Sequence, residues 1–218
     1  MNKIAPRLHI EFAAGSSKAA ILRRGPSEWT RLLLWDTVTD DVEAGAWFHG
    51  RIYKDCCSIS PDGRLFSYLA AKHNGNQGGE DACGSWTAIS RPPWLTAIAF
   101  WPQHGSQGLS TDFIDNNTLM ISHPHWDELS PKYEIPNGFS VISKYTSLDA
   151  PEQSLPSPVK SAARFHNNNG VDQQCRSFRY AEGKLFRGDS LIVDLGAMIP
   201  NPEPSPMWAR TWTDDALK

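Results

Sequence analysis

Short runs of apolar residues, separated by turns rich in glycine and proline, extend along most of this chain. Residues 8–12 (LHIEF) alternate apolar and polar side chains, and a second run, residues 18–24, follows a Gly-Ser-Ser turn. A period of two places successive side chains on opposite faces of a β-strand. The pattern therefore predicts an all-β fold that begins with two half-buried strands.

Residues 30–53 continue this pattern with a more deeply buried pair of strands. Three consecutive leucines, residues 32–34, do not alternate with polar residues, which predicts an inner strand covered on both faces. A polar turn near Asp40 separates this strand from its return through residues 47–48. An amphipathic helix is the alternative for this segment, but its β-branched residues and its glycine favour strands.

A strand–turn–strand pattern occurs in residues 57–73 and recurs further along the chain. Its turn is Asp-Gly at positions 62–63, which favours a hairpin because glycine readily adopts a positive φ. A shift of 54 residues places the same pattern on residues 112–123, with Asn-Asn at the turn, positions 116–117. Asparagine also tolerates the left-handed region. A weaker third copy is AEGKLF, residues 181–186. We therefore expect one hairpin to recur in the fold.

The remaining segments complete a single β domain that spans residues 1–218. Further strands are expected in residues 85–91, 94–101, 139–142 and 177–195. Polar or proline-rich loops are expected at residues 73–84, 148–161 and 166–170. The extended tail, residues 198–218, contains four closely spaced prolines and is expected to lack regular structure, while Trp208 and Trp212 hold it against the body.

Two segments carry a resemblance to a known family. SPDGRLFSY, residues 60–68, resembles the inner-strand hairpin of bacterial β-propeller repeats. LLLWDTVTDD, residues 32–41, resembles the end of a WD-repeat strand with Trp35-Asp36 as the dipeptide, although no Gly-His pair precedes it. A blade takes about 40–50 residues, so the resemblance implies a small β-propeller-like arrangement of roughly four blades. It also implies a platform whose loops bind partners. An irregular β-sandwich is the alternative architecture.

Composition and charge narrow the functional classes. The formal net charge of −3 gives no large positive field, which argues against nucleic-acid binding. Basic residues are scattered, and Arg23-Arg24 is the one adjacent pair in the first half of the chain. No apolar run approaches the roughly 18 residues of a membrane span, and His9 and Glu11 interrupt any N-terminal signal sequence. Four cysteines without a C-x-x-C pair favour reduced, buried thiols. A cytoplasmic protein that binds neither nucleic acid nor membrane is therefore expected.

One short segment carries the sharpest candidate for metal chemistry. His123 and His125 lie two residues apart near the end of a predicted strand, and Asp127 follows two residues later. This His-x-His-x-Asp pattern resembles the first metal-binding segment of the metallo-β-lactamase fold, in which zinc converts a bound water into a hydroxide nucleophile. That family has a histidine directly after the aspartate, where this chain has Glu128, and His166 is the candidate for a further ligand. The alternative interpretation is a strand end with two surface histidines around a proline.

These observations predict a non-enzymatic protein-interaction module without a cofactor, for example an immunity or accessory protein that binds a macromolecular partner. A metal-dependent hydrolase that uses zinc at the His-x-His-x-Asp residues is the alternative. A third hypothesis concerns the nine tryptophans, since buried rings build a core and exposed rings bind carbohydrate or other small ligands. The sequence contains no signal for the oligomeric state.

Overall fold

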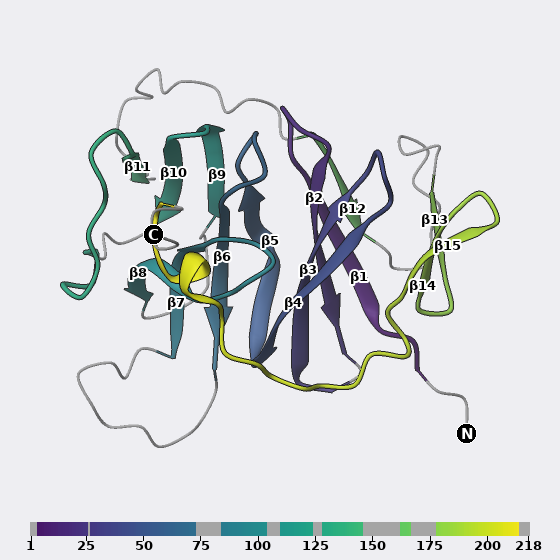
Figure 1. The fold of residues 1–218 in the computed structure, drawn as a ribbon. Helices are drawn as coiled ribbons and strands as arrows, with labels where there is room; N and C mark the ends of the chain where they lie inside the picture. Colours follow the sequence, from purple (N-terminus) through teal and green to yellow (C-terminus); the bar gives the residue numbers. More distant parts are fainter. Residues whose placement is uncertain are drawn as a thin grey trace.

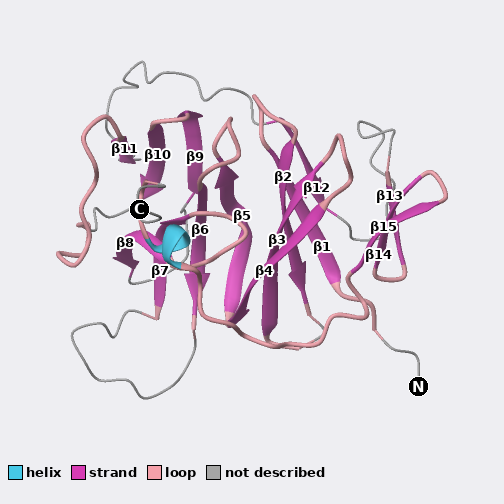
Figure 2. Ribbon diagram, viewed as in Figure 1, coloured by secondary structure: helices cyan, strands magenta, loops and turns pink. Residues whose placement is uncertain are grey.

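Figure 1 shows the chain in a computed structural model, which describes residues 4–25, 27–72, 84–103, 110–123, 128–145, 162–166 and 178–213. These residues form an all-β fold, as the sequence predicts, and Figure 2 shows strands and loops with one short helical turn. The elements are β1 (Arg7–Phe12), β2 (Lys18–Arg24), β3 (Trp29–Asp36), β4 (Val42–His49), β5 (Arg51–Ile59), β6 (Phe66–Ala71), β7 (Ser85–Ser90), β8 (Ala97–Gln103), β9 (Ser110–Asp115), β10 (Thr118–His123), β11 (Ser140–Tyr145), β12 (Ala162–His166), β13 (Arg179–Ala181), β14 (Lys184–Arg187), β15 (Ser190–Asp194) and the 3₁₀ turn η1 (Met207–Arg210).

The strands form four sheets. The first sheet has the order β12-β1-β2-β3-β4, the second β5-β6-β7-β8, the third β11-β10-β9 and the fourth β13-β14-β15. Neighbouring strands are antiparallel except for β10 and β11, which are parallel. Because an antiparallel pair needs only a short turn, strands that follow one another in the chain become neighbours in a sheet. Most of the first and second sheets are built in this way.

The four sheets stack in a row in the order fourth, first, second, third (Figure 1). Alternation along β2 shows how the first sheet is covered on both faces. Ala20 and Leu22 belong to the core shared with the second sheet, whereas Ala19 and Ile21 belong to the core shared with the fourth. The leucines of residues 32–34 divide in the same way, with Leu32 in one core and Leu33 in the other. The predicted inner strand is therefore confirmed.

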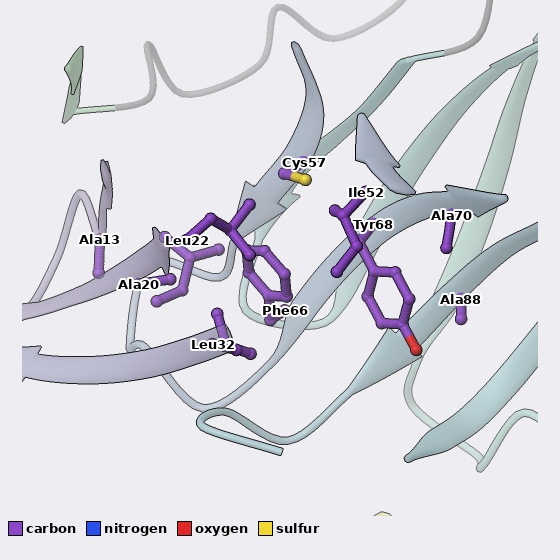
Figure 3. Close-up of a cluster of buried hydrophobic side chains, with 11 residues drawn as sticks. Ala13, Ala20, Leu22, Leu32, Ile52, Cys57, Phe66, Tyr68, Ala70 and Ala88 are labelled. Atoms are coloured by element: carbon purple, nitrogen blue, oxygen red, sulfur yellow. The ribbon is translucent and has the colours of Figure 1, made fainter. Parts of the chain in front are cut away.

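Figure 3 shows the core between the first and second sheets, in which the Phe66 ring lies beside Leu22 and Leu32. The rings of Phe66 and Tyr68 are stacked, with centroids 6.0 Å apart. The Tyr68 hydroxyl donates a hydrogen bond to the carbonyl oxygen of Leu95 (2.6 Å), so the polar end of this buried ring has a partner. The fully or nearly buried members of this core are Ala13, Ala20, Leu22, Leu32, Ile52, Cys57, Ile59, Phe66, Tyr68, Ala70 and Ala88.

Both copies of the pattern are antiparallel hairpins, β5–β6 and β9–β10, but six residues (60–65) join the first pair of strands and two (116–117) join the second. The two turns touch, since the backbone N–H of Asp62 donates a hydrogen bond to Oδ1 of Asn116 (2.9 Å). Gly63 has a φ of 77°, as expected for an Asp-Gly turn. The second turn does not use the left-handed region that asparagine tolerates, because neither Asn116 nor Asn117 has a positive φ. The Asp115 carboxylate holds this turn instead by accepting the N–H of Asn117 (2.7 Å).

The third copy of the pattern is also a hairpin. Glu182 and Gly183 join β13 to β14 with φ values of 51° and 83°, and two positive φ values match the twist of a two-residue hairpin. The three copies thus lie in the second, third and fourth sheets. The third and fourth sheets are at opposite ends of the row (Figure 1). The described residues therefore establish a stack of four sheets, and a four-bladed propeller stays a prediction.

The tail runs back along the body, as predicted (Figure 1). The carbonyl oxygen of Trp208 accepts a hydrogen bond from Nη1 of Arg91 (2.8 Å), and the Arg91 guanidinium lies over the Trp208 ring. The indole N–H of Trp212 donates to the carbonyl oxygen of Glu134 (3.1 Å). The tail departs from the expected lack of regular structure at one place, where Pro206 precedes the single turn of η1.

The predicted loops at residues 73–84 and 148–161 fall almost wholly outside the described residues. The prediction that a loop begins at residue 166 is wrong for that residue. His166 is the last residue of the strand β12 and lies opposite His9 of β1. The physical reason is that β1 has an open edge of backbone N–H and C=O groups on the side away from β2, and a further strand satisfies them.

An ion pair joins the first sheet to the fourth. Nε of Arg187 in β14 donates to Oδ2 of Asp40 (2.6 Å), and its Nη2 donates to Oδ1 (2.8 Å). The indole N–H of Trp35 donates to the same Oδ1 (3.0 Å). The hydrogen bonds from Arg187, and then the one from Trp35, favour the charged carboxylate and hold the pKa of Asp40 below its ordinary value.

Acid is expected to weaken this connection. The pKa of Asp40 is lower in the folded chain than its unfolded value of about 3.9, so its contribution to stability is complete above about pH 5 and is lost as the pH falls through the folded pKa. We expect Asp40→Asn to reduce the fall in melting temperature between about pH 5 and pH 2. Asp41→Asn is the control, because it neutralises an adjacent carboxylate outside the ion pair. Circular dichroism at each pH measures this effect, and a wild-type slope in Asp40→Asn would contradict it.

Candidate functional site

The residues of the predicted zinc site are distributed over two sheets and an undescribed segment. His123 is the last residue of β10 in the third sheet, and His166 is the last residue of β12 in the first sheet. Figure 1 shows these two strands in different parts of the molecule. His125 and Asp127 lie outside the described residues. Among the residues that the structure describes, no group of three or more His, Cys, Asp or Glu side chains could hold a metal ion. The zinc site stays a prediction.

The tryptophans serve mainly the packing of the sheets. Trp35, Trp47 and Trp101 are buried. Every other tryptophan in the described ranges is half-buried, and none is exposed. The hypothesis of ligand binding on exposed indole rings therefore has no support in this part of the chain.

A hollow of about 830 Å³ lies where the first and fourth sheets meet the N-terminal segment and the tail. We call it the apolar groove, and it is lined by residues 4–6, residues 196–200, Arg23, Glu182, Lys184 and Asp194. Seven of its twelve lining residues are aliphatic, proline or methionine. Ile4 and Ile199 both line it, with 73% and 80% of their surface exposed, so large apolar side chains face solvent here.

Arg23 lines the apolar groove and is itself only 5% exposed. Its Nε donates to the carbonyl oxygen of Leu195 (3.2 Å) and its Nη2 to that of Met198 (3.4 Å), which fixes the start of the tail. Its guanidinium lies 5.1 Å from the centre of the Trp47 ring. Its Nη1 is buried and has no hydrogen-bond acceptor among the described residues. Burial lowers the pKa of Arg23.

Two further contacts hold the walls of the apolar groove. The Tyr180 hydroxyl donates a hydrogen bond to the carbonyl oxygen of Pro6, which ties the N-terminal segment to β13. Burial raises the pKa of Tyr180 to about 12, so this hydroxyl keeps its proton at neutral pH. Lys184 and Asp194 form an ion pair (3.7 Å) across β14 and β15. The walls are therefore shaped before anything binds.

One feature of the sequence indicates this groove. Ile199 stands between methionine and proline in a segment without regular structure, and an apolar residue there has no strand face on which to be buried. The other lining residues are widely separated in the chain, and only the packing of the fourth sheet on the first brings them together.

Comparison of the chain with protein-family models, with curated proteins and with solved structures finds no match. Within the described ranges, no helix has the length and apolar character needed to cross a membrane.

Proposed function

We propose that this chain is a non-enzymatic protein-interaction module that binds an extended, largely apolar segment of a partner protein in the apolar groove. It would serve as an immunity or accessory protein, which covers part of the surface of another protein. The stacked meanders of the first and second sheets support a propeller-like scaffold behind the groove. The observation that carries the proposal is the pair Ile4 and Ile199, which are large, apolar and exposed in one hollow.

The charges of the apolar groove favour an uncharged apolar segment. Arg23 and Lys184 are balanced by Glu182 and Asp194, so the lining has no net charge to attract an ion. Protein interfaces of moderate size commonly have an apolar centre and a polar rim, and this lining has both kinds of residue.

Selection from a random peptide library displayed on phage tests this proposal directly. Peptides enriched on the purified protein are expected to share apolar positions. Their affinity is expected to fall by roughly tenfold or more in Ile199→Asp and in Ile4→Asp, because a charge then replaces a buried apolar contact. Isothermal titration calorimetry measures the affinity of each variant.

Val38→Asp is the matched control, because Val38 is also 80% exposed but lies in the β3–β4 turn, outside the groove. It should leave peptide affinity unchanged. Failure of the library to enrich any peptide would overturn the proposal. Enriched peptides that bind Ile199→Asp and Ile4→Asp as tightly as the wild type would overturn it as well.

A further inference from the structure

A second hollow, of about 210 Å³, lies between the first and second sheets, and Gly50, which joins β4 to β5, is among its lining residues. Figure 1 shows the edge at which β4 is followed by β5. We call this hollow the basic pocket. Its charged lining consists of Arg7, Arg24, Arg51, Lys72, Glu28 and His49. None of these residues lines the apolar groove, so binding in the basic pocket does not depend on the function proposed for that groove.

The strand order explains why four cations converge here. Arg7 begins β1 and lies opposite Arg24, which ends β2. Arg51 begins β5 and lies opposite Ala71 at the end of β6, and Lys72 follows directly. In antiparallel sheets the start of one strand and the end of the next share an edge. Because the first and second sheets stack through a common core, these two basic edges face the same hollow.

The positive charge of the basic pocket is poorly balanced. Glu28 is the one acidic side chain of the lining, and it pairs with His49 (3.3 Å). No ion pair is found for Arg7, Arg24, Arg51 or Lys72 within the described ranges. Burial lowers the pKa of the Arg24 guanidinium, and the charges of Arg7 and then Arg51 lower it further, with smaller opposite contributions from Cys57 and then Asp55. The cations therefore repel one another.

The floor of the basic pocket is a rigid corner of the backbone. The N–H of Gly50 donates to the carbonyl oxygen of Glu28 (3.0 Å), and the Thr30 hydroxyl donates to that of Gly50 (3.4 Å). A Cβ on Gly50 would lie 2.6 Å from the Phe48 ring and 2.8 Å from the carbonyl oxygen of Ala71, so the two sheets meet closely here. This corner fixes the backbone position of Arg51, the next residue, whose guanidinium lies 4.7 Å from the centre of the Tyr53 ring.

We infer that the basic pocket binds the phosphate group of a small phosphorylated molecule. Three guanidinium groups and one ammonium group supply the planar, paired donors and the point charge that phosphate oxygens accept. A multiply charged phosphate compensates several cations at once, whereas a single carboxylate leaves most of the repulsion in place. The size of the hollow and its position between two sheets fit a small ligand, and the overall charge of −3 disfavours a nucleic acid.

Inorganic pyrophosphate is the probe for this site. At matched ionic strength it is expected to raise the melting temperature above the value in sodium chloride, because a ligand of the folded state stabilises it. Arg51→Gln and Arg7→Gln should each weaken pyrophosphate binding by roughly tenfold, as measured by isothermal titration calorimetry. Both side chains are exposed. Without ligand, Arg7→Gln should melt at or above the wild-type temperature, because one repelling charge has been removed. Arg51→Gln should melt near the wild-type temperature, because the lost repulsion is offset by the lost contact of the guanidinium with the Tyr53 ring (4.7 Å).

Arg179→Gln is the matched control, because Arg179 is exposed and belongs to the fourth sheet, away from this pocket. It removes the same charge and should keep wild-type pyrophosphate affinity. The inference is overturned if pyrophosphate adds nothing beyond sodium chloride, or if Arg179→Gln loses as much affinity as Arg51→Gln. It is also overturned if succinate binds as tightly as pyrophosphate, or if a short DNA duplex binds more tightly through the same arginines.

Discussion

Replacement of Trp35 by alanine is expected to lower the free energy of unfolding by about 3–5 kcal/mol. Trp35 is 1% exposed and lies in the core between the first and fourth sheets. Its ring packs edge-on against Phe178, with centroids 5.6 Å apart, and its indole N–H donates to Asp40 (3.0 Å). The substitution leaves a cavity and removes the donor that helps to orient the carboxylate paired with Arg187.

Urea denaturation followed by circular dichroism measures this loss. Trp35→Phe is the matched control, because it keeps an aromatic ring in the core and removes mainly the hydrogen bond to Asp40. We expect it to cost about 1–2 kcal/mol. A loss below about 1 kcal/mol in Trp35→Ala would show that the fourth sheet does not pack on this residue in solution.

Gly45→Ala is expected to destabilise the fold by about 3 kcal/mol, because it forces two backbone segments apart. A Cβ at Gly45 would lie 1.9 Å from the carbonyl oxygen and 2.5 Å from the carbonyl carbon of Pro93. Neither atom belongs to a flexible side chain that can move aside. The adjacent N–H of Ala46 donates to the same Pro93 oxygen (3.0 Å), so separation of the segments also breaks this hydrogen bond between β4 and the β7–β8 loop.

Gly84→Ala provides the matched control for this steric effect. A Cβ at Gly84 would meet nothing within 4 Å, and its φ is not in the positive range. We expect this substitution to change stability by no more than about 0.5 kcal/mol. Urea denaturation measures the loss of stability in both variants. The difference between the two losses is the cost of the steric contact at Gly45, because both variants share the general effect of replacing glycine by alanine. Equal midpoints for the two variants would contradict the contact between Gly45 and Pro93.

The two hollows differ in how much of their lining the sequence could predict. Arg23 and Arg24 form the one adjacent basic pair in the first half of the chain. Neighbouring residues of a strand point to opposite faces, and the structure places Arg23 in the apolar groove and Arg24 in the basic pocket. The sequence alone could predict this divergence. It could not predict that Arg7 and Arg51 approach Arg24, because this depends on how two sheets are stacked. The predicted zinc site at His123 belongs to neither hollow.

Local patterns determined the class of fold and most of its strands. These patterns are the alternation at residues 8–12, the continuous apolar run at residues 32–34 and the Asp-Gly turn at residues 62–63. Each depends on the conformational preferences of a few neighbouring residues, and such short-range preferences can be recognised in a single sequence. Tertiary structure alone decided the order of the four sheets, the addition of β12 to β1, the parallel pairing of β10 with β11, and both hollows. These features join segments that are far apart in the chain, and many alternative partners offer the same apolar faces and strand edges. Their choice therefore depends on the packing of the whole molecule.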